Sequence, residues 1–505
     1  MTDATTVAFH LNGVEVHGDA QASLLQVLRA AGAVSVKDGC SPQGQCGCCT
    51  VWVDGQPRVA CVTPAARVAG RQVTTLEALP DAADWARRLC NSGGSQCGFC
   101  TPGIIMRLAA IPPAQRTVAS VRQALLAHLC RCTGWNTVVE AALAPPAAEF
   151  GWSRAPAPSA RRSLLEGGAP QQVSPEVALG NGGFAADTAP ADALVAVRGA
   201  DGEWVVAESH AAALRASGKV QGRRTTEPLR WPIEVPEGDW VRTLQTTWVE
   251  PAYLEPDAAW CEPGGEPVGP LCNGGAFGGK LRSEVGEVAR RLAAQHQRTV
   301  LALYSREDVV RLGPKRPPVA AGIRADGTGV MRVARTEGIA DAIRSVAPGL
   351  EVHEVDVPGP PTSAALRGAG WVEAAVLLAP DDGWVSSPDG GRASARFADD
   401  GSLDIAVRCG AVIDEGVVRS YCIGAAHMAL GWVRREAIAV DADGTPLDLT
   451  IRSFGVLRAT ETPAVRVTII TDGTSVNGSD AVFAAVALAA WRATGFAPRW
   501  PTMRT

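Results

Sequence analysis

The sequence lacks the features of a nucleic-acid-binding or membrane-spanning protein. Its 47 Lys and Arg residues are outnumbered by 52 Asp and Glu residues, which gives a formal net charge of −5. Neither the first 150 residues nor the remainder is strongly basic, so we expect no nucleic-acid partner, because phosphates are bound by clustered cations. No run of about 18 apolar residues occurs, so we expect no membrane span.

An export signal is also missing, since the N-terminus has neither a basic segment nor an apolar core. We therefore expect a cytoplasmic protein, with export alongside a partner left open. The composition is 46% hydrophobic and 20% charged, as in ordinary globular proteins, which excludes wholesale disorder. At roughly 150 residues per domain, 505 residues suggest about three domains.

Cysteine is the informative residue, and its distribution is uneven. Ten of the 14 cysteines lie between Cys40 and Cys132, at short, paired spacings. In a long chain without an export signal, such pairs favour metal binding over disulfides.

Local patterns predict an α+β fold in several parts. Alternating residues on both sides of Asn12-Gly13 indicate a hairpin, the run 23–31 has helical spacing, and 50–61 indicates a second hairpin. Hairpin, helix, loop and hairpin is the order of a plant-type ferredoxin β-grasp domain, which we place at residues 1–76.

Three further segments follow. We expect a helical domain at 77–145, and a linker at 146–170, where Pro and Gly are frequent. Residues 171–505 alternate between strand and helix signals and are expected to form a mixed α/β region.

The cysteines form two groups that suit iron–sulfur clusters. The first group resembles the plant-type [2Fe–2S] pattern of three close cysteines and a distant fourth, and comprises Cys40, Cys46, Cys49 and Cys61. The second group comprises Cys97, Cys100, Cys130 and Cys132. Structural zinc stays open as an alternative, although C-x-C is an unusual zinc half-site. Cys48 is predicted to be a buried packing thiol and not a ligand.

Three motifs carry a family resemblance: Gly39-Cys-Ser-Pro-Gln-Gly-Gln-Cys-Gly-Cys-Cys-Thr-Val, Gln96-Cys-Gly-Phe-Cys-Thr-Pro-Gly and Leu129-Cys-Arg-Cys-Thr-Gly-Trp. They closely resemble the iron–sulfur subunit of the xanthine oxidase, or molybdenum hydroxylase, family. The resemblance implies one [2Fe–2S] cluster in the β-grasp domain and one in the helical domain, the latter nearer to molybdopterin. It also implies that Gln96 and Cys132 lie close to the pterin, which we expect in a partner chain.

Residues 171–505 resemble the molybdenum-binding large subunit of that family more weakly. The segments Pro251–Asp257, Gly274–Lys280 and Leu366–Gly370 follow in family order. The region has roughly half the usual length and lacks the family's Thr-Gln and Gly-Gln-Gly segments. Where the family has a glutamate as general base, this chain has Asn477 or Ser479, neither of which accepts a proton as a carboxylate does. We therefore expect a scaffold with no catalytic residue and no bound molybdopterin.

Other candidate residues are interpreted as structural. The glycine loop 274–279 is expected to be a turn, although a phosphate site is its alternative. Arg306 and Arg367 are expected to form structural salt bridges, and His353 and His427 to be surface or core residues. The remaining cysteines are expected to be buried: Cys261, Cys272, Cys409 and Cys422.

Three functional hypotheses follow. The first is an electron-transfer subunit that passes electrons from a full-length molybdenum-binding partner subunit through two [2Fe–2S] clusters to a flavoprotein, a cytochrome or a soluble acceptor. The second is a complete single-chain molybdenum hydroxylase. The third is a non-redox assembly or maturation protein. The substrate class stays open.

Overall fold

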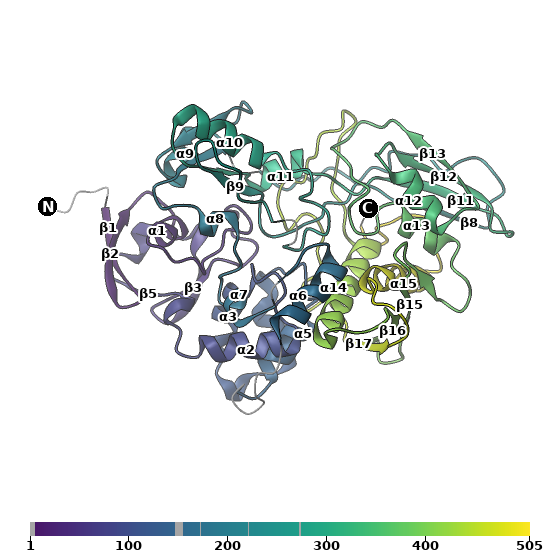
Figure 1. Cartoon of the computed structure of the whole chain (residues 1–505), viewed down its shortest axis with the longest axis horizontal. Helices are drawn as coiled ribbons and strands as arrows, with labels where there is room; N and C mark the ends of the chain where they lie inside the picture. Colours follow the sequence, from purple (N-terminus) through teal and green to yellow (C-terminus); the bar gives the residue numbers. More distant parts are fainter. Residues whose placement is uncertain (1–5, 147–154, 172, 221, 272–273, 505) are drawn as a thin grey trace.

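The computed structural model describes residues 6–146, 155–171, 173–220, 222–271 and 274–504. The molecule is elongated, with the N-terminal segments at one end and the later segments at the other (Figure 1). Four sheets carry most of the strands. None of the described helices has the length and apolar character that a bilayer crossing needs.

The first sheet has the order β2-β1-β5-β3-β4. Its strands are β1 (Thr6–Leu11), β2 (Val14–Asp19), β3 (Thr50–Val53), β4 (Gln56–Val59) and β5 (Gln72–Thr74). The predicted hairpin at Asn12-Gly13 is confirmed, because both residues adopt the positive φ of a tight turn. Helix α1 (Leu24–Ala30) begins at Ser23, whose side chain forms a capping box with Gln26. The loop between α1 and β3 carries three of the predicted ligands.

A group of short helices follows the sheet: α2 (Ala82–Ser92), α3 (Thr101–Ala109), α4 (Val118–Ala124) and α5 (Asn136–Leu143). Short 3-10 turns connect them and the sheet: η1 (Ala60–Val62), η2 (Ala65–Val68), η3 (Leu76–Ala78), η4 (Pro113–Gln115) and η5 (Leu125–Ala127). The α2 and α5 helices pack together, and Trp85 and Leu89 of α2 are fully buried. This packing fixes the loops before α3 and α5, where the second cysteine group lies.

The prediction of a linker over residues 146–170 is wrong for much of its length. Residues Pro156–Gly167 form helix α6, which begins with a proline in its first turn and ends at Gly168 in the left-handed conformation. The side chains of Arg162 and Glu166 are fully buried and form an ion pair. Glu166 also accepts hydrogen bonds from the backbone of Gly478 and Ser479. The prediction relied on the frequent Pro and Gly residues, and composition does not reveal the distant partners that stabilise this helix. Residues 147–154 lie outside the described part of the chain.

The rest of the chain forms three more four-stranded sheets with helices packed on them. The second sheet, β7-β6-β10-β9, contains β6 (Leu194–Arg198), β7 (Trp204–Ala207), β9 (Ala258–Cys261) and β10 (Val300–Leu303). The third, β13-β12-β11-β8, contains β8 (Arg242–Gln245), β11 (Val319–Ile323), β12 (Gly329–Ala334) and β13 (Leu350–Val355). The fourth, β14-β15-β16-β17, contains β14 (Val385–Ser386), β15 (Arg392–Phe397), β16 (Leu403–Arg408) and β17 (Val465–Ile470). The helices that accompany these three sheets are α7 (Pro175–Ala178), α8 (Ala185–Thr188), α9 (His210–Ala216), α10 (Val285–His296), α11 (Arg306–Leu312), α12 (Ile339–Val346), α13 (Trp371–Leu377), α14 (Glu415–Arg434) and α15 (Ser479–Arg492).

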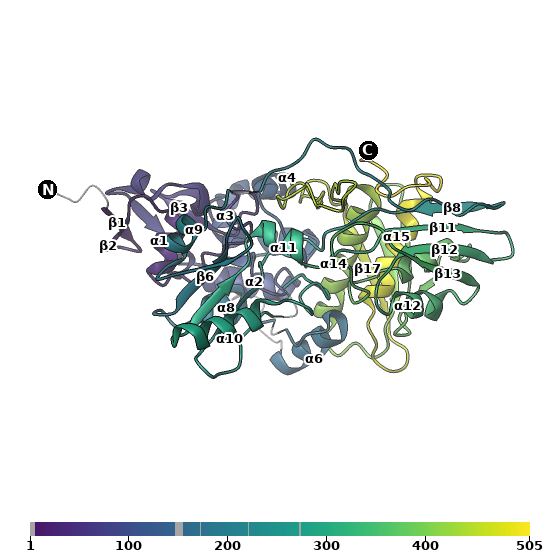
Figure 2. The same ribbon diagram turned by 90° about the horizontal axis from the view of Figure 1, so that it is seen from above.

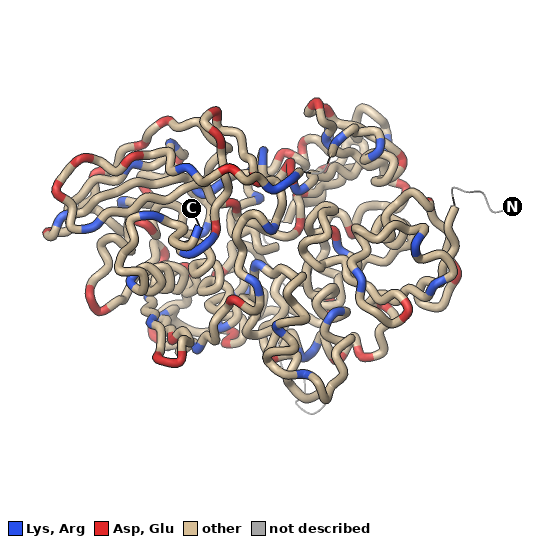
Figure 3. Tube along the Cα trace, turned by 180° about the vertical axis from the view of Figure 1, so that it is seen from behind, with Lys and Arg blue, Asp and Glu red and all other residues tan. Residues whose placement is uncertain are grey.

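Helix α14 lies at the centre of the molecule and connects its two ends. Its residues 417–418 and 420–433 are buried on every side, as expected for a helix within a core. It packs along α15 and also contacts α2 and α6, so it reaches the N-terminal region as well as the fourth sheet. Figure 2 shows α14 between the two ends of the molecule. Positive and negative residues are interspersed along the whole trace (Figure 3).

Candidate metal centres

The first cysteine group lies where the loop after α1 meets the β3–β4 hairpin. Cys40, Cys46 and Cys49 are in the loop, and Cys61 is in the η1 turn that follows β4. The hairpin pairs Thr50 with Val59 and so brings Cys61 back beside Cys49. The Cys61 amide donates a hydrogen bond to the Cys49 Sγ at 3.4 Å. All four side chains are buried.

Thiol–thiol and amide–thiol hydrogen bonds connect this first group. The Cys40 thiol contacts those of Cys46 and Cys61, and Cys61 also contacts Cys49. The amides of Gln43 and Gln45 point at the Cys40 Sγ, at 3.1 and 3.4 Å. Amides directed at a ligand sulfur stabilise its negative charge and tune the potential of a cluster. The four sulfurs and their amides suit a [2Fe–2S] cluster.

Cys97 and Cys100 lie just before α3, and Cys130 and Cys132 lie in the loop before α5. The Cys132 Sγ is 3.6 Å from the Cys97 Sγ, and Cys100 contacts Cys130. The contact with Cys100 lowers the pKa of Cys130 to about 6, while the same contact raises the pKa of Cys100. Two thiol pairs therefore face each other within this second group.

Paired thiols suit two irons better than one. In a [2Fe–2S] cluster each iron takes two of the four thiolates and shares the bridging sulfides, so two pairs are the required arrangement. Mononuclear zinc, the alternative left open by the sequence, needs four donors around one point.

The two cysteine loops are in direct contact. A methyl group at Gly103 of α3 would lie 2.4 Å from the carbonyl oxygen of Gly47, so only glycine permits this approach. The Leu129 amide donates to the Cys46 carbonyl at 3.0 Å. His128 fills the space beside Gly47 and contacts Thr50 at 3.2 Å. Burial lowers the pKa of His128 to about 3, so it is neutral at physiological pH. The sites are positioned against each other by backbone packing.

Gln96 and Cys132 are not accessible to a partner chain, contrary to the expectation from the sequence. Their exposed fractions are 3% and 4%. The Gln96 amide donates to the Cys132 carbonyl and to the Ser420 hydroxyl of α14, both at 2.9 Å. A methyl group at Gly275 would lie 3.2 Å from the Cys132 Sγ, so the glycine loop packs against this cysteine. This chain's own second half therefore covers both residues.

A small cavity lies next to Arg131, the residue that precedes Cys132 in the chain. Its volume is about 20 Å³, enough for one water molecule and far below the 300–1,000 Å³ of usual cofactor sites. Arg131, Glu250 and Phe277 are among its lining residues. A space of this size is too small for a molecule as large as molybdopterin.

Ion pairs occupy the surroundings of this cavity. Arg131 binds Glu436 through two hydrogen bonds of 2.6 Å, with both side chains at most 4% exposed. Lys315 pairs with Glu250 at 2.9 Å, and both are fully buried. The sequence interpretation missed these pairs, since their members are far apart in the chain.

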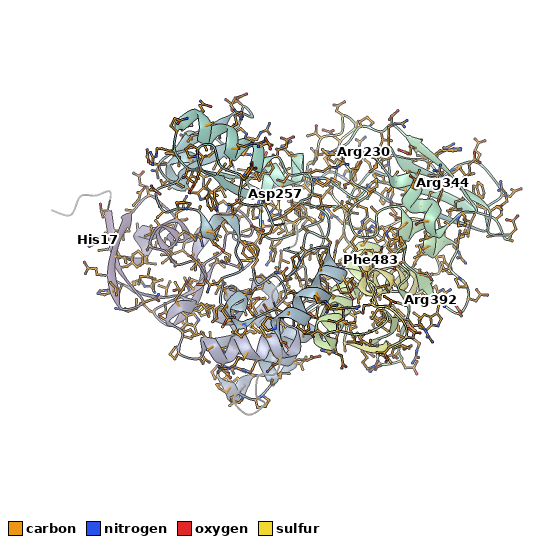
Figure 4. All side chains as sticks on the ribbon, viewed as in Figure 1. His17, Arg230, Asp257, Arg344, Arg392 and Phe483 are labelled. Carbon is orange, nitrogen blue, oxygen red and sulfur yellow. The ribbon has the colours of Figure 1, made fainter. Side chains whose placement is uncertain are left out.

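Asn477 and Ser479, which stand where the family has its general base, and the neighbouring Asp480 form structural contacts. Asp480 pairs with Arg367 at 2.8 Å, which confirms the salt bridge expected for that arginine. Asn477 accepts a hydrogen bond from the Asp480 amide, and Ser479 accepts one from Arg367. Figure 4 labels Phe483 on the same helix, in the interior of the molecule.

Several other expectations can now be compared with the structure. The salt bridge expected for Arg306 is wrong: this buried guanidinium donates to the carbonyls of Tyr253, Leu254 and Gly39, at 2.8, 2.7 and 2.6 Å. His427 is buried and His353 lies at the surface, as expected. Burial is also confirmed for Cys261, Cys409 and Cys422, and Cys272 lies outside the described residues.

Comparison with known proteins shows which family the chain belongs to. The model of the [2Fe-2S] binding domain matches residues 75–143. The xanthine dehydrogenase iron-sulfur-binding subunit of Escherichia coli O157:H7 is 36% identical over 151 residues, which is 28% of this chain and 94% of that subunit. This chain belongs to the xanthine dehydrogenase family. It is also 40% identical over 148 residues to the aldehyde oxidoreductase of Megalodesulfovibrio gigas, of which it covers 16%. The family is one of oxidoreductases, and the chain has a [2Fe–2S] binding domain.

Two solved structures share the fold of nearly the whole chain. The aldehyde oxidoreductase from Desulfovibrio gigas aligns with a TM-score of 0.67 at 14% identity, spanning 96% of this chain and 97% of that one. The enzyme from Desulfovibrio desulfuricans gives a TM-score of 0.68 at the same identity and the same coverage. At this identity the likeness concerns the fold alone.

Proposed function

We propose that this chain is an electron-transfer protein with two [2Fe–2S] clusters, whose second half is a scaffold without molybdopterin. Cys40, Cys46, Cys49 and Cys61 would hold one cluster, and Cys97, Cys100, Cys130 and Cys132 the other. Each bound cluster supplies a site that accepts and releases one electron. The observation that carries the proposal is the direct packing of the glycine loop and α14 on Cys132 and Gln96.

The protein's own residues have three tasks in this proposal. Backbone amides such as those of Gln43 and Gln45 stabilise charge on the Cys40 sulfur. The packing of Gly103 on Gly47 keeps the two cysteine loops close, which electron transfer between clusters requires. Burial of all eight cysteines excludes water and so limits hydrolysis and oxidation of bound clusters.

Electrons would come from a molybdenum-binding catalytic subunit in another chain and leave to a flavoprotein, cytochrome or small acceptor. Because Gln96 and Cys132 are covered by α14, such a subunit would dock over the second half and not on these two side chains. The domain boundaries at 76 and 145 remain part of this proposal, and the scaffold now includes α6, so the boundary at 170 is dropped.

A complete single-chain hydroxylase is the second candidate. The alignment that spans 97% of an aldehyde oxidoreductase chain favours this candidate, since the shorter chain keeps the fold of that enzyme. The small size of the cavity next to Arg131 opposes it, because that cavity holds no more than a water molecule. A non-redox assembly protein is opposed by the retention of all eight ligand cysteines.

Metal quantitation on the isolated chain separates the three candidates. About four iron atoms and no molybdenum per chain is the expected result. Four iron atoms with one molybdenum would establish the single-chain enzyme instead, and neither metal would establish the assembly protein. Molybdopterin released from the denatured chain is an independent readout of the second case.

A further inference from the structure

A large cavity separates the β-grasp sheet from the second sheet and is not used by the proposed function above. Its volume is about 660 Å³, within the 300–1,000 Å³ of typical small-molecule sites. One wall is formed by β2 and α1, and the opposite wall by α9 and strands of the second sheet. Figure 4 labels His17 on the β2 wall.

The cavity reaches the ligand loops of both cysteine groups. Ser41, which follows Cys40, is in its wall, and so is Phe99, which lies between Cys97 and Cys100. The Phe99 ring also approaches the first group, because a methyl group at Gly39 would lie 3.2 Å from it and 3.1 Å from the Cys46 Sγ. A molecule in the cavity would therefore lie beside both proposed clusters.

The wall favours an uncharged aromatic molecule. Phe99 and Phe184 meet edge to face, with ring centres 5.1 Å apart, and apolar strand residues such as Leu301 and Leu303 extend this surface. The wall contains five carboxylates but only two cations, Arg29 and Lys37. Both cations already pair with Asp187, so neither is left to bind a phosphate. A nucleotide or dinucleotide is therefore disfavoured.

Polar groups are available for a ligand that carries oxygen atoms. Ser209 and His210, at the start of α9, are in the wall and can donate hydrogen bonds to carbonyl oxygens. Glu255 is 2% exposed, and its Oε1 atom has no hydrogen-bond partner among the described residues. Burial raises the pKa of Glu255 to about 7, against the ion pair that its Oε2 atom forms with the buried Lys280, so this carboxyl carries a proton part of the time at neutral pH.

We propose that this cavity binds a quinone, which accepts electrons from the clusters; this rests on the proposed electron-transfer function. Reduction to a hydroquinone takes two electrons and two protons. The two reduced clusters supply one electron each and are oxidised. Two O–H bonds form, one with the proton of Glu255 and one with a proton from solvent, which also reprotonates Glu255.

The test uses the full-length, iron-loaded chain and menadione as the quinone. Equilibrium dialysis should give saturable binding of one menadione per chain and no binding of FAD. Ala211→Trp, on the cavity side of α9, should weaken binding at least tenfold by filling the space. The matched control Ala216→Trp changes the same residue type on the same helix, at an exposed position outside the cavity wall, and should bind as the wild type.

A kinetic readout adds to the binding data. After reduction with dithionite, reoxidation by menadione should slow at least tenfold in Ala211→Trp, while reoxidation by ferricyanide stays unchanged. If Ala211→Trp fails to fold, Ala191→Trp at the exposed rim replaces it.

Three results would overturn the cavity proposal: no saturable binding, equal binding by the two α9 variants, or tighter binding of FAD. The outcome is separable from that of the proposed function. Four iron atoms without menadione binding removes the cavity proposal alone. Specific menadione binding by a chain that takes up no iron keeps the ligand site and removes the electron-transfer function.

Discussion

The two regions of this molecule stand in different relations to their family. The first region, which contains the eight cysteines, shares 36% of its residues with a bacterial iron–sulfur subunit. The complete chain shares only 14% with aldehyde oxidoreductases, although the fold is retained throughout. Clusters need particular side chains at fixed places, whereas a fold needs mainly an apolar pattern. The difference teaches that a retained fold in the second region does not by itself establish the chemistry of that region.

The largest expected effect concerns the cysteines of the first region. Cys49→Ser should remove about two iron atoms and one EPR signal of the dithionite-reduced chain, because Cys49 belongs to the first group only. Cys100→Ser should remove the other two iron atoms and the other signal. Iron quantitation and low-temperature EPR measure both.

Loss of both signals in either variant, with an unchanged circular dichroism spectrum, would show that the groups are not separate sites. Cys261→Ser is the matched control, since this buried cysteine lies in the second sheet and should leave four iron atoms bound.

Local signals in the sequence were sufficient for much of this fold. Asn12-Gly13 specified a hairpin and Ser23 a helix start through contacts with near neighbours. Helix α6 was missed because Arg162 and Glu166 are stabilised by residues more than 240 positions away. The same reason applies to the covering of Gln96 by Ser420 and to the cavity beside Phe99. A local sequence motif shows which cysteines can bind a cluster. Whether those residues are exposed to a partner depends on the tertiary structure.

The second prediction concerns the ion pair that connects the two regions. Arg131→Ala leaves Glu436 buried without a partner, and removal of one member of a buried pair typically costs about 3–5 kcal/mol of folding free energy. Urea unfolding of the complete chain should show this loss. Arg419→Ala breaks a partly exposed pair with Glu140 between the same regions and should cost roughly 0–1 kcal/mol.

A double variant sharpens this result. Arg131→Met with Glu436→Leu should regain part of the loss, because apolar side chains need no charged partner. Equal costs for Arg131→Ala and Arg419→Ala would mean that the buried pair does not hold the regions together.

The third prediction concerns a buried carboxyl of the second region. Burial raises the pKa of Glu373 from its ordinary 4.5 to about 7, against the opposing effect of Arg316. Between these pH values the folded chain holds a proton that the unfolded chain releases, so this group makes folding less favourable as pH rises. At about 1.4 kcal/mol per pKa unit, the loss is about 3 kcal/mol between pH 4.5 and 7.

Glu373→Gln should remove this loss, because an amide resembles the protonated acid at every pH. The variant should match the wild type near pH 4.5 and exceed it in unfolding free energy at pH 8. Glu461→Gln is the control, since Glu461 is partly exposed and its pKa is lowered, with hydrogen bonds from Arg458 and Arg435 outweighing burial. The prediction would be contradicted if the difference in unfolding free energy between the variant and the wild type did not grow from pH 5 to pH 8.

The smallest effect is expected at Cys48, which tests the ligand assignment within the first region. Cys48 lies between Gly47 and Cys49, and its thiol contacts Cys46 and points toward Gly39. As a packing thiol, it should be replaceable: Cys48→Ala should keep four iron atoms and both EPR signals, at a cost of about 1 kcal/mol for the lost buried sulfur. Cys46→Ala, two residues away and equally buried, should instead lose two iron atoms and the first signal. If Cys48→Ala loses the first cluster and Cys46→Ala keeps it, the ligand register of the loop is shifted, and the assignment of Cys40 would have to be revised with it.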